Sequence, residues 1–225
     1  MTETTEAEIR DLIPRRKSDS SKRDYGSVLA IAGSEYYRGA AVLSSAAALR
    51  VGAGYVTLAC PRSVAVSVAA VLPDAVLLPL RTKHGCLRGM EYPKVAAAAR
   101  RAGVIVLGCG LSSPSGGTHS LRRFFKRVMG VLSGLSVPVV LDADGLNLLA
   151  ELQPLALPAS LVMTPHEAEL ARLLKTEVAA VRADDGQTLW VSLYPRSRRG
   201  TLAKPAPHWR RELNPCLLRQ GTLFV

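Results

Sequence analysis

Between Gly26 and Leu174 the sequence alternates short apolar runs with longer segments rich in Ala and Leu. The apolar runs contain β-branched residues and are bounded by Gly, Pro or Asp, as is typical of strands buried on both faces. We expect strands at residues 27–33, 55–60, 75–80, 104–108, 137–143 and 160–164. We expect helices at residues 39–51, 63–71, 91–102, 118–132, 144–151 and 166–175. This alternation predicts a three-layer α/β/α fold with a mostly parallel central sheet.

The length and composition suit one large domain without a membrane span. The chain has 225 residues, of which 48% are hydrophobic, and no run of 18 apolar residues lacks charges. The N-terminus has no basic segment followed by an apolar one, so we expect no secretory signal and a cytoplasmic protein. Four cysteines without CxxC pairs or nearby histidines predict reduced thiols and no metal bound by side chains. They are Cys60, Cys86, Cys109 and Cys216.

Unusual residues gather in four turns that follow predicted strands. The turns read AGSEYYRGA, GCGLSS, DADGLN and TPHEAE. Ligands of parallel α/β sheets bind beyond the carboxyl ends of the strands. We therefore expect the four turns to form one rim of a binding site.

The first two turns are rich in small residues. Gly39 opens an Ala-rich helix whose free backbone N–H groups can face an anion or a polar ligand, and Ala40 allows a flat ring to approach. Gly108 and Gly110 let a ligand pass close to the main chain. Each turn taken alone is also explained by ordinary strand-to-helix turn chemistry. The first turn is not GxGxxG and no acid ends the second strand, which disfavours a Rossmann dinucleotide site.

The last two turns carry acids and a histidine. Asp144 is predicted to cap the helix that follows it, and Asp142 to hold a loop or face a metal-bound phosphate. Thr164 is predicted to cap the next helix, with Pro165 at its first position. His166 would lie in the first helical turn, where the helix dipole disfavours its protonation. We expect a neutral imidazole that hydrogen-bonds a ligand.

Together these turns resemble the NAD(P)H-hydrate dehydratases, which are related to the ribokinase-like kinases. The resemblance covers about residues 15–181. It is carried by DYGSVLAIAGSEYYRGAAVLSSAAALRVGAGYVTLA, VIVLGCGLS, PVVLDADGLNLLA and LVMTPHEAELARLL. It implies a ribokinase-like domain at residues 1–181 and the repair of hydrated NADH and NADPH. In that reaction ADP or ATP phosphorylates the hydroxyl formed by hydration, and loss of phosphate restores the double bond.

The resemblance also implies roles for particular residues. Ala40, Gly110 and His166 would contact the hydrated dinucleotide. Glu169 would order magnesium-bound water near the phosphates. The resemblance further implies ADP or ATP with Mg²⁺ as cofactors, and a homo-oligomer. The residues expected to shape the same cleft are Gly39, Asp142, Asp144 and Asn147.

Three departures from the family pattern stand out. Cys109 replaces the proline of a GPG turn, and residues 21–26 read SKRDYG where the family has HKGD-x-G. The later KG-x-x-T and NPG…GGSGD elements are absent. In the family, the GSGD glycines stabilise the transferring phosphoryl group and the aspartate accepts the hydroxyl proton. We therefore name no catalytic residue, and expect impaired activity and a fold that is incomplete at the C-terminus.

Residues 182–225 differ from the rest of the chain. They hold eight Lys and Arg against three acids, four prolines and both tryptophans, with no period of 2 or 3.6. We expect an irregular basic tail. Our preferred hypothesis is a shifted reading frame after about residue 185, and the alternative is a short paralogue with a new tail. Losing the last strands and helices would expose a sheet edge and an apolar face, which predicts poor solubility.

Two other functions remain open from the sequence. A small-molecule kinase of the same fold, acting on a sugar or vitamin, would share the TP-x-x-x-E pattern, but His166 replaces the Asn common in those kinases. A non-catalytic nucleic-acid-binding protein is suggested by the net charge of +11 and the aromatic, Arg-rich tail. The tail supplies +5 of this charge and the first 181 residues supply +6, so the charge is dense only in the tail, and we expect no nucleic acid partner.

Overall fold

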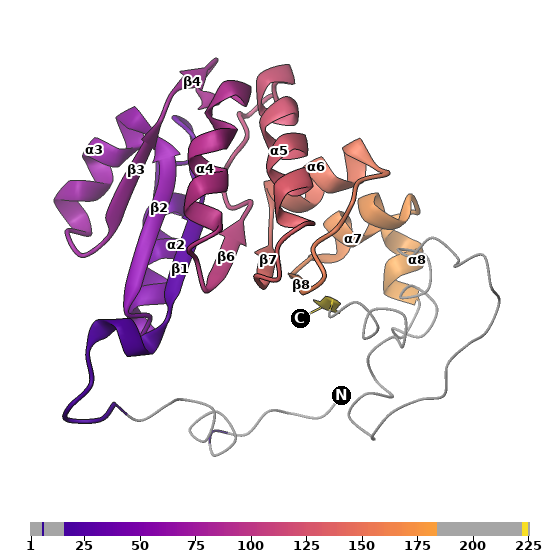
Figure 1. The fold of residues 1–225 in the computed structure, drawn as a ribbon. Helices are drawn as coiled ribbons and strands as arrows, with labels where there is room; N and C mark the ends of the chain where they lie inside the picture. Colours follow the sequence, from indigo (N-terminus) through magenta and orange to yellow (C-terminus); the bar gives the residue numbers. More distant parts are fainter. Residues whose placement is uncertain (1–5, 7–15, 184–221, 225) are drawn as a thin grey trace.

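The structure is a computed structural model that describes residue 6, residues 16–183 and residues 222–224. Its centre is a seven-stranded parallel sheet in the order β3-β2-β1-β6-β7-β8-β9 (Figure 1). The strands of this sheet are β1 (Ser27–Ile31), β2 (Tyr55–Pro61), β3 (Val76–Leu80), β6 (Val104–Leu107), β7 (Val139–Leu141), β8 (Leu161–Met163) and β9 (Thr222–Phe224). A separate antiparallel hairpin consists of β4 (Thr82–Lys83) and β5 (Cys86–Leu87).

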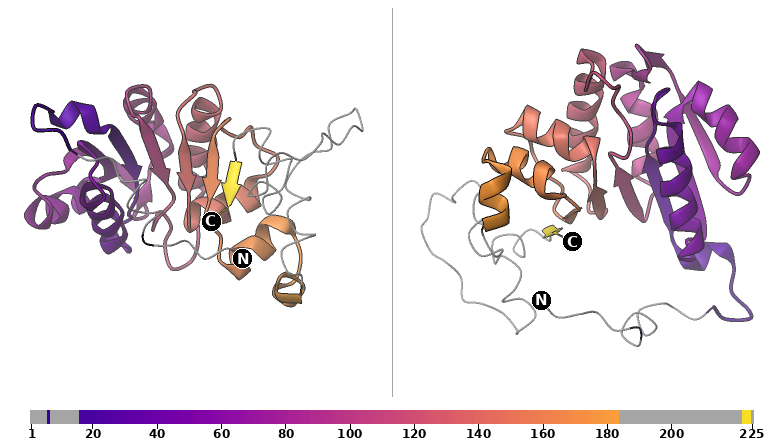
Figure 2. Two further views of the ribbon diagram at one scale, coloured as in Figure 1. Left: turned by 90° about the horizontal axis from the view of Figure 1, so that it is seen from below. Right: turned by 180° about the vertical axis from the view of Figure 1, so that it is seen from behind.

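Helices lie on both sides of the sheet (Figure 2). The α-helices described are α2 (Arg38–Arg50), α3 (Arg62–Val71), α4 (Tyr92–Ala99), α5 (His119–Leu132), α6 (Asp144–Leu152), α7 (Glu167–Leu174) and α8 (Val178–Ala183). Two 3₁₀ helices are η1 (Lys22–Tyr25) and η2 (Gly89–Glu91). None of the helices in the described ranges is long and apolar enough to cross a bilayer.

The predicted α/β fold class is confirmed. Each of the six expected strands and each of the six expected helices is present, with ends that differ by a few residues. The sequence did not predict the hairpin β4–β5, whose strands are too short to show a period. It also did not predict β9, which lies in the segment 182–225 that we expected to be irregular. Most of that segment lies outside the described residues.

Successive side chains of β1 belong to two different cores, one on each face of the sheet. Leu29 and Ile31 belong to the larger core, which also contains the two phenylalanines of α5. Ala30 and Ala32 belong to a smaller core formed with α2 and α3. Successive side chains of a strand point to opposite faces, so one strand supplies both cores. The small residues on the second face allow α2 to pack closely against the sheet.

The smaller core does not continue fully across the sheet. Val106, Val140 and Val162 are register neighbours of Ala30 and therefore lie on its face of the sheet. All three are only half-buried, whereas Val139 on the opposite face is 1% exposed. The two faces of β7 therefore differ in how much apolar surface they bury.

This difference predicts unequal costs for one substitution at adjacent positions. Val139→Thr places a hydroxyl in the closed core without a partner, and we expect it to lower the free energy of unfolding by about 1–3 kcal/mol. Val140→Thr, on the half-buried face, can be hydrated and should cost less. Urea unfolding of both variants measures the difference. Equal losses would contradict the assignment of the two faces.

Candidate functional site

The four predicted turns begin at one edge of the sheet. Strand register pairs Ile31 with Leu107, Leu107 with Leu141, and Leu141 with Met163, so these strands end side by side. The structure therefore brings the four turns together, as we expected from a parallel sheet.

Backbone hydrogen bonds join neighbouring turns. The amide of Gly33 donates to the carbonyl of Cys109 at 2.8 Å, which joins the turn after β1 to the turn after β6. The amide of Asp142 donates to the carbonyl of Leu107 at 3.1 Å, and that of Thr164 to the carbonyl of Leu141 at 3.3 Å. These bonds hold the rim as one unit.

Gly110 and Ala40 are in direct contact range. Gly110 has φ +65°, and a Cβ placed on it would lie 2.6 Å from Cβ of Ala40 and 2.9 Å from Cβ of Tyr37. Only glycine fits this position, because both the backbone angle and the space exclude a side chain. Gly39 is exposed and a Cβ there would meet nothing within 4 Å. The turns after β1 and β6 therefore pack directly against each other at Ala40 and Gly110.

The turns after β6 and β7 pack backbone against backbone. Gly108 has φ +133°, and a Cβ on it would overlap the carbonyl oxygen of Asp142. A Cβ on Gly145 would lie 3.0 Å from Cα of Gly108. Ala143, which follows Asp142 in the sequence, has φ +50°, and this angle is unusual for a residue with a side chain. Such a conformation persists only where surrounding contacts hold it. The sequence did not identify Ala143 as special.

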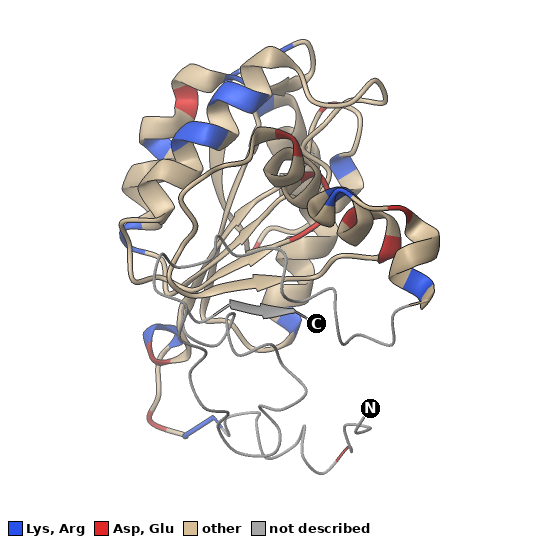
Figure 3. Cartoon of the chain, turned by 90° about the vertical axis from the view of Figure 1, so that its right-hand side faces the viewer, with Lys and Arg blue, Asp and Glu red and all other residues tan. Residues whose placement is uncertain are grey.

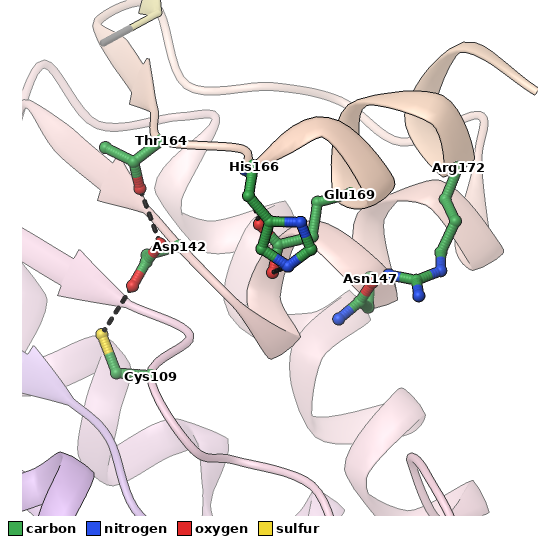
Figure 4. A network of polar contacts seen from close by, with 7 residues as sticks. All are labelled: Cys109, Asp142, Asn147, Thr164, His166, Glu169 and Arg172. Carbon is green, nitrogen blue, oxygen red and sulfur yellow. Dashed lines mark hydrogen bonds and ion pairs between the residues drawn. The ribbon is translucent and has the colours of Figure 1, made fainter. Parts of the chain in front are cut away.

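Asp142 links three of the turns (Figure 4). Its Oδ2 accepts a hydrogen bond from Sγ of Cys109 at 3.4 Å, and its Oδ1 accepts one from Oγ1 of Thr164 at 2.7 Å. Of the two roles predicted for Asp142, the geometry supports holding a loop. Burial, and next the negative charge of Asp142, raise the pKa of the Cys109 thiol to about 12. The thiol is therefore a donor in this network and not a nucleophile.

The predicted cap of α6 is wrong. The N-cap is Ala143, and Asp144 is already the first helical residue. Oδ2 of Asp144 instead accepts a hydrogen bond from the backbone amide of Ser112 at 2.9 Å. The positive φ of Ala143 starts the helix one residue early and directs the carboxylate of Asp144 to the loop after β6.

The predicted cap of α7 is also wrong. The N-cap is His166, the helix begins at Glu167, and Pro165 precedes the cap. The hydroxyl of Thr164 is engaged by Asp142, so it does not cap the helix. The backbone amide of His166 donates to Oε2 of Glu169 at 3.1 Å. A glutamate three residues into the helix performs this function in capping boxes.

His166 and Glu169 form a pair in which only the histidine is accessible. Nε2 of His166 lies 3.2 Å from Oε1 of Glu169, with the side chains 66% and 7% exposed. A carboxylate accepts hydrogen bonds, so Nε2 is the donor in this pair. The His166 side chain also takes part in the capping box of α7. Both oxygens of Glu169 contact His166. Its expected role near magnesium-bound water stays a prediction, as does the neutral state of His166.

Asp144 and Asn147 line a separate groove of about 520 Å³ between the loop after β6, α6 and α7. Oδ1 of Asn147 accepts a hydrogen bond from Arg172 of α7 at 2.8 Å. Ala40, Gly110 and His166 do not line this groove. The eight predicted residues therefore divide between the rim and this neighbouring groove. Arg172 was missed because its motif position has no distinctive spacing.

The described residues contain no group of three or more His, Cys, Asp or Glu side chains that could hold a metal ion.

We predict opposite effects for two Gly→Ala substitutions on this rim. Gly110→Ala introduces a strained φ and a clash with Ala40, and should cost about 1–3 kcal/mol. Gly39→Ala adds a methyl group to an open position within α2 and should stabilise by up to about 1 kcal/mol. Thermal melts of both variants test this. A neutral Gly110→Ala would show that the turn is looser than the structure indicates.

The raised pKa of Cys109 predicts slow alkylation. With a pKa of about 12, only about one thiol in ten thousand is ionised at pH 8. Asp142→Asn removes the neighbouring charge, lowers the pKa of Cys109 and should speed its reaction with iodoacetamide. Thr164→Val retains that charge and should leave the reaction slow. Peptide mass spectrometry follows Cys109 specifically. Equal rates in the two variants would refute an electrostatic effect of Asp142.

The chain is similar to known NAD(P)H-hydrate dehydratases in sequence. A family model described as NAD(P)H-hydrate dehydratase matches residues 28–193, which extends past the predicted boundary at residue 181. An ADP-dependent (S)-NAD(P)H-hydrate dehydratase of Lactiplantibacillus plantarum is 32% identical over 216 residues, covering 92% of this chain and 70% of that protein. A bifunctional NAD(P)H-hydrate repair enzyme Nnr of Salinibacter ruber is 37% identical over 182 residues.

The similarity extends to solved structures. An ADP/ATP-dependent NAD(P)H-hydrate dehydratase from Bacillus subtilis, co-crystallized with ATP and Mg²⁺, superposes with a TM-score of 0.61 and 28% identity. The match covers 81% of this chain and 59% of that chain. The match to the Salinibacter enzyme covers 79% of this chain but only 32% of the relative. On the family match and the Lactiplantibacillus relative, the chain belongs to the NAD(P)H-hydrate dehydratase family.

Proposed function

We propose that this chain binds hydrated NADH and NADPH at the rim formed by the four turns, and belongs to an ADP- or ATP-dependent dehydration system. The contact of Ala40 with Gly110 is the observation that carries the proposal. It brings together two of the residues predicted to contact the substrate, at the carboxyl edge of a parallel sheet, where ligands of such sheets bind. The names of the relatives supply the substrate class.

His166 would provide the polar contact to the substrate. Glu169 contacts Nε2, so the ring is oriented before a ligand arrives, and the His166 side chain is exposed to solvent. Asp142 would act at a distance by holding the turns of Cys109 and Thr164 in place. Both roles are binding and positioning, and neither moves the proton of the substrate hydroxyl.

The overall reaction that we propose is balanced in two steps. The hydroxyl oxygen of the hydrated ring attacks the terminal phosphorus of ADP or ATP and loses its proton. The P–O bond to the rest of the nucleotide breaks, and AMP or ADP leaves with that electron pair. The phosphate then leaves with the electrons of the C–O bond while a ring C–H proton is lost, which restores the double bond. The base for the first step is expected from the family's GSGD element, which is absent here.

Magnesium does not have an evident protein site in the ranges that the structure describes, because no cluster of three ligand side chains exists there. Mg²⁺ commonly binds through substrate phosphates and few carboxylates. Mg²⁺ would therefore bind with the nucleotide, through its phosphates. A homo-oligomeric state, a cytoplasmic location and the shifted-frame hypothesis for residues 182–225 remain predictions.

The dehydratase proposal is favoured over the two alternatives. The matched family model is described as NAD(P)H-hydrate dehydratase, and the relatives from Salinibacter ruber and Lactiplantibacillus plantarum are named as a hydrate repair enzyme and a hydrate dehydratase. Lys and Arg of the described residues are spread over several helices and loops, with acids among them (Figure 3). A nucleic-acid site would instead favour a continuous basic surface.

We expect this chain to bind its substrate but to convert it only slowly. We expect NADH hydrate to bind in isothermal titration calorimetry, with little recovery of NADH absorbance when ADP or ATP with Mg²⁺ is added. His166→Ala should weaken binding about tenfold, as loss of one good hydrogen bond does. Glu167→Ala, at the neighbouring exposed position, should bind as the unchanged protein does. Absence of any binding would refute the proposal, and rapid turnover would refute the expected impairment.

A further inference from the structure

A basic pocket lies at the same edge of the sheet as the rim. It has a volume of about 250 Å³ between the hairpin β4–β5, η2 and the start of α5. We call this cavity the basic pocket, because its lining includes Lys83, His84, Arg88, His119 and Arg123. None of these residues belongs to the four turns, and no role was predicted for any of them.

Among the described residues, the cationic side chains of the basic pocket have no carboxylate partner. No carboxylate lines it. Lys83, Arg88 and Arg123 form no ion pair within the part of the chain that the structure describes. Like charges gathered around a cavity repel one another and attract an anion. Arg in particular matches the geometry of phosphate oxygens through bidentate hydrogen bonds.

The walls of the basic pocket are held by short-range contacts. The amide of Gly89 donates to Oγ of Ser120 at 3.1 Å, which joins η2 to α5. A Cβ on Gly89 would lie 3.2 Å from three side-chain carbons of Arg123, so the Arg123 stem packs on this backbone. Cys86 in the hairpin is fully buried beneath the pocket wall. A site with fixed walls loses little conformational entropy when a ligand binds.

Direct contacts connect the basic pocket to the rim. The amide of Glu35, in the turn after β1, donates to the carbonyl of Gly85 at 2.9 Å. Gly85 follows His84, and a Cβ on it would overlap the ring of Tyr36. The next residue, Tyr37, contacts the position of Gly110.

The two tyrosines between the rim and the basic pocket are accessible. Tyr36 is 53% exposed and Tyr37 is 42% exposed. Tyr36 packs at Gly85 of the hairpin and Tyr37 packs at Gly110 of the rim, so the two exposed side chains offer apolar surface between these two places. This sequence of surfaces suits an extended ligand that has a flat ring and a phosphate group.

We propose that the basic pocket binds a phosphate group of the hydrated dinucleotide whose ring lies at Ala40 and Gly110. This inference rests on the proposed function. A dinucleotide offers a pyrophosphate in both substrates, and a further 2′-phosphate in NADPH hydrate only. Either phosphate has the chemistry that the pocket recognises.

The test compares charge-removing variants in calorimetric titrations of the full chain. Arg88→Gln and Arg123→Gln should each weaken binding of NADPH hydrate about tenfold, the range expected for one charge-assisted hydrogen bond. Arg101→Gln is the matched control, because Arg101 is exposed at the opposite end of the sheet, just before β6. It removes the same charge and should leave binding unchanged. Thermal melts confirm that each variant folds, and Lys83→Gln at the exposed hairpin replaces any variant that does not.

The pattern of losses distinguishes the phosphates. Equal losses with NADH hydrate and NADPH hydrate assign the pyrophosphate, whereas a loss confined to NADPH hydrate assigns the 2′-phosphate. Unchanged affinity in both pocket variants, or an equal loss in Arg101→Gln, overturns the proposal.

A separate probe keeps this test independent of the proposed function. If the unchanged protein binds neither hydrate, the proposed function fails, and inorganic pyrophosphate is then titrated while the NMR signals of His84 and His119 are followed. Shifts that disappear in Arg123→Gln show that the pocket is a phosphate site for another ligand, which overturns its assignment to this substrate. Absence of shifts overturns the site itself.

Discussion

The close approach of the turn after β6 to the turn after β7 is the contact on which the rest of the site depends. Gly108 lies so near the carbonyl of Asp142 that no side chain fits between them. That proximity brings the Asp142 carboxylate within reach of Cys109 on one side and Thr164 on the other. A single carboxylate thereby fixes three turns, and the positive φ of Ala143 is the local conformational cost of this arrangement.

Cys109 shows how a departure from the family pattern is accommodated. A proline at this position would restrict the turn through its ring, whereas the thiol restricts it through a hydrogen bond to Asp142. Because burial and the neighbouring charge both disfavour the thiolate, the donor form is maintained at neutral pH. The substitution therefore exchanges a covalent constraint for a polar one without adding a reactive group.

The candidate binding residues at this edge of the sheet fall into three places. Ala40, Gly110 and His166 lie on the rim, Asp144 and Asn147 line the groove beside α6, and five basic side chains surround the pocket beneath the hairpin. The proposed substrate is a molecule with a flat ring and several phosphates. Exposed tyrosines, and cations that form no ion pair among the described residues, provide complementary surfaces for those groups.

The sequence by itself determined the order of strands and helices, the parallel sheet and the shared edge of the four turns. The reason is that the hydrophobic period and the flanking Gly, Pro and Asp residues are local signals. The same local signals misplaced both helix caps. Thr164 and Asp144 have the right side chains for capping, but Asp142 and the amide of Ser112, distant in sequence, engage them first. The sequence also did not predict the hairpin β4–β5 or the basic pocket, because the pocket joins residues in and next to the hairpin, such as Lys83 and Arg88, to Arg123 of α5. Only tertiary packing decided which of these groups meet, because hydrogen bonds and charges act between atoms that are close in space, whatever their separation along the chain.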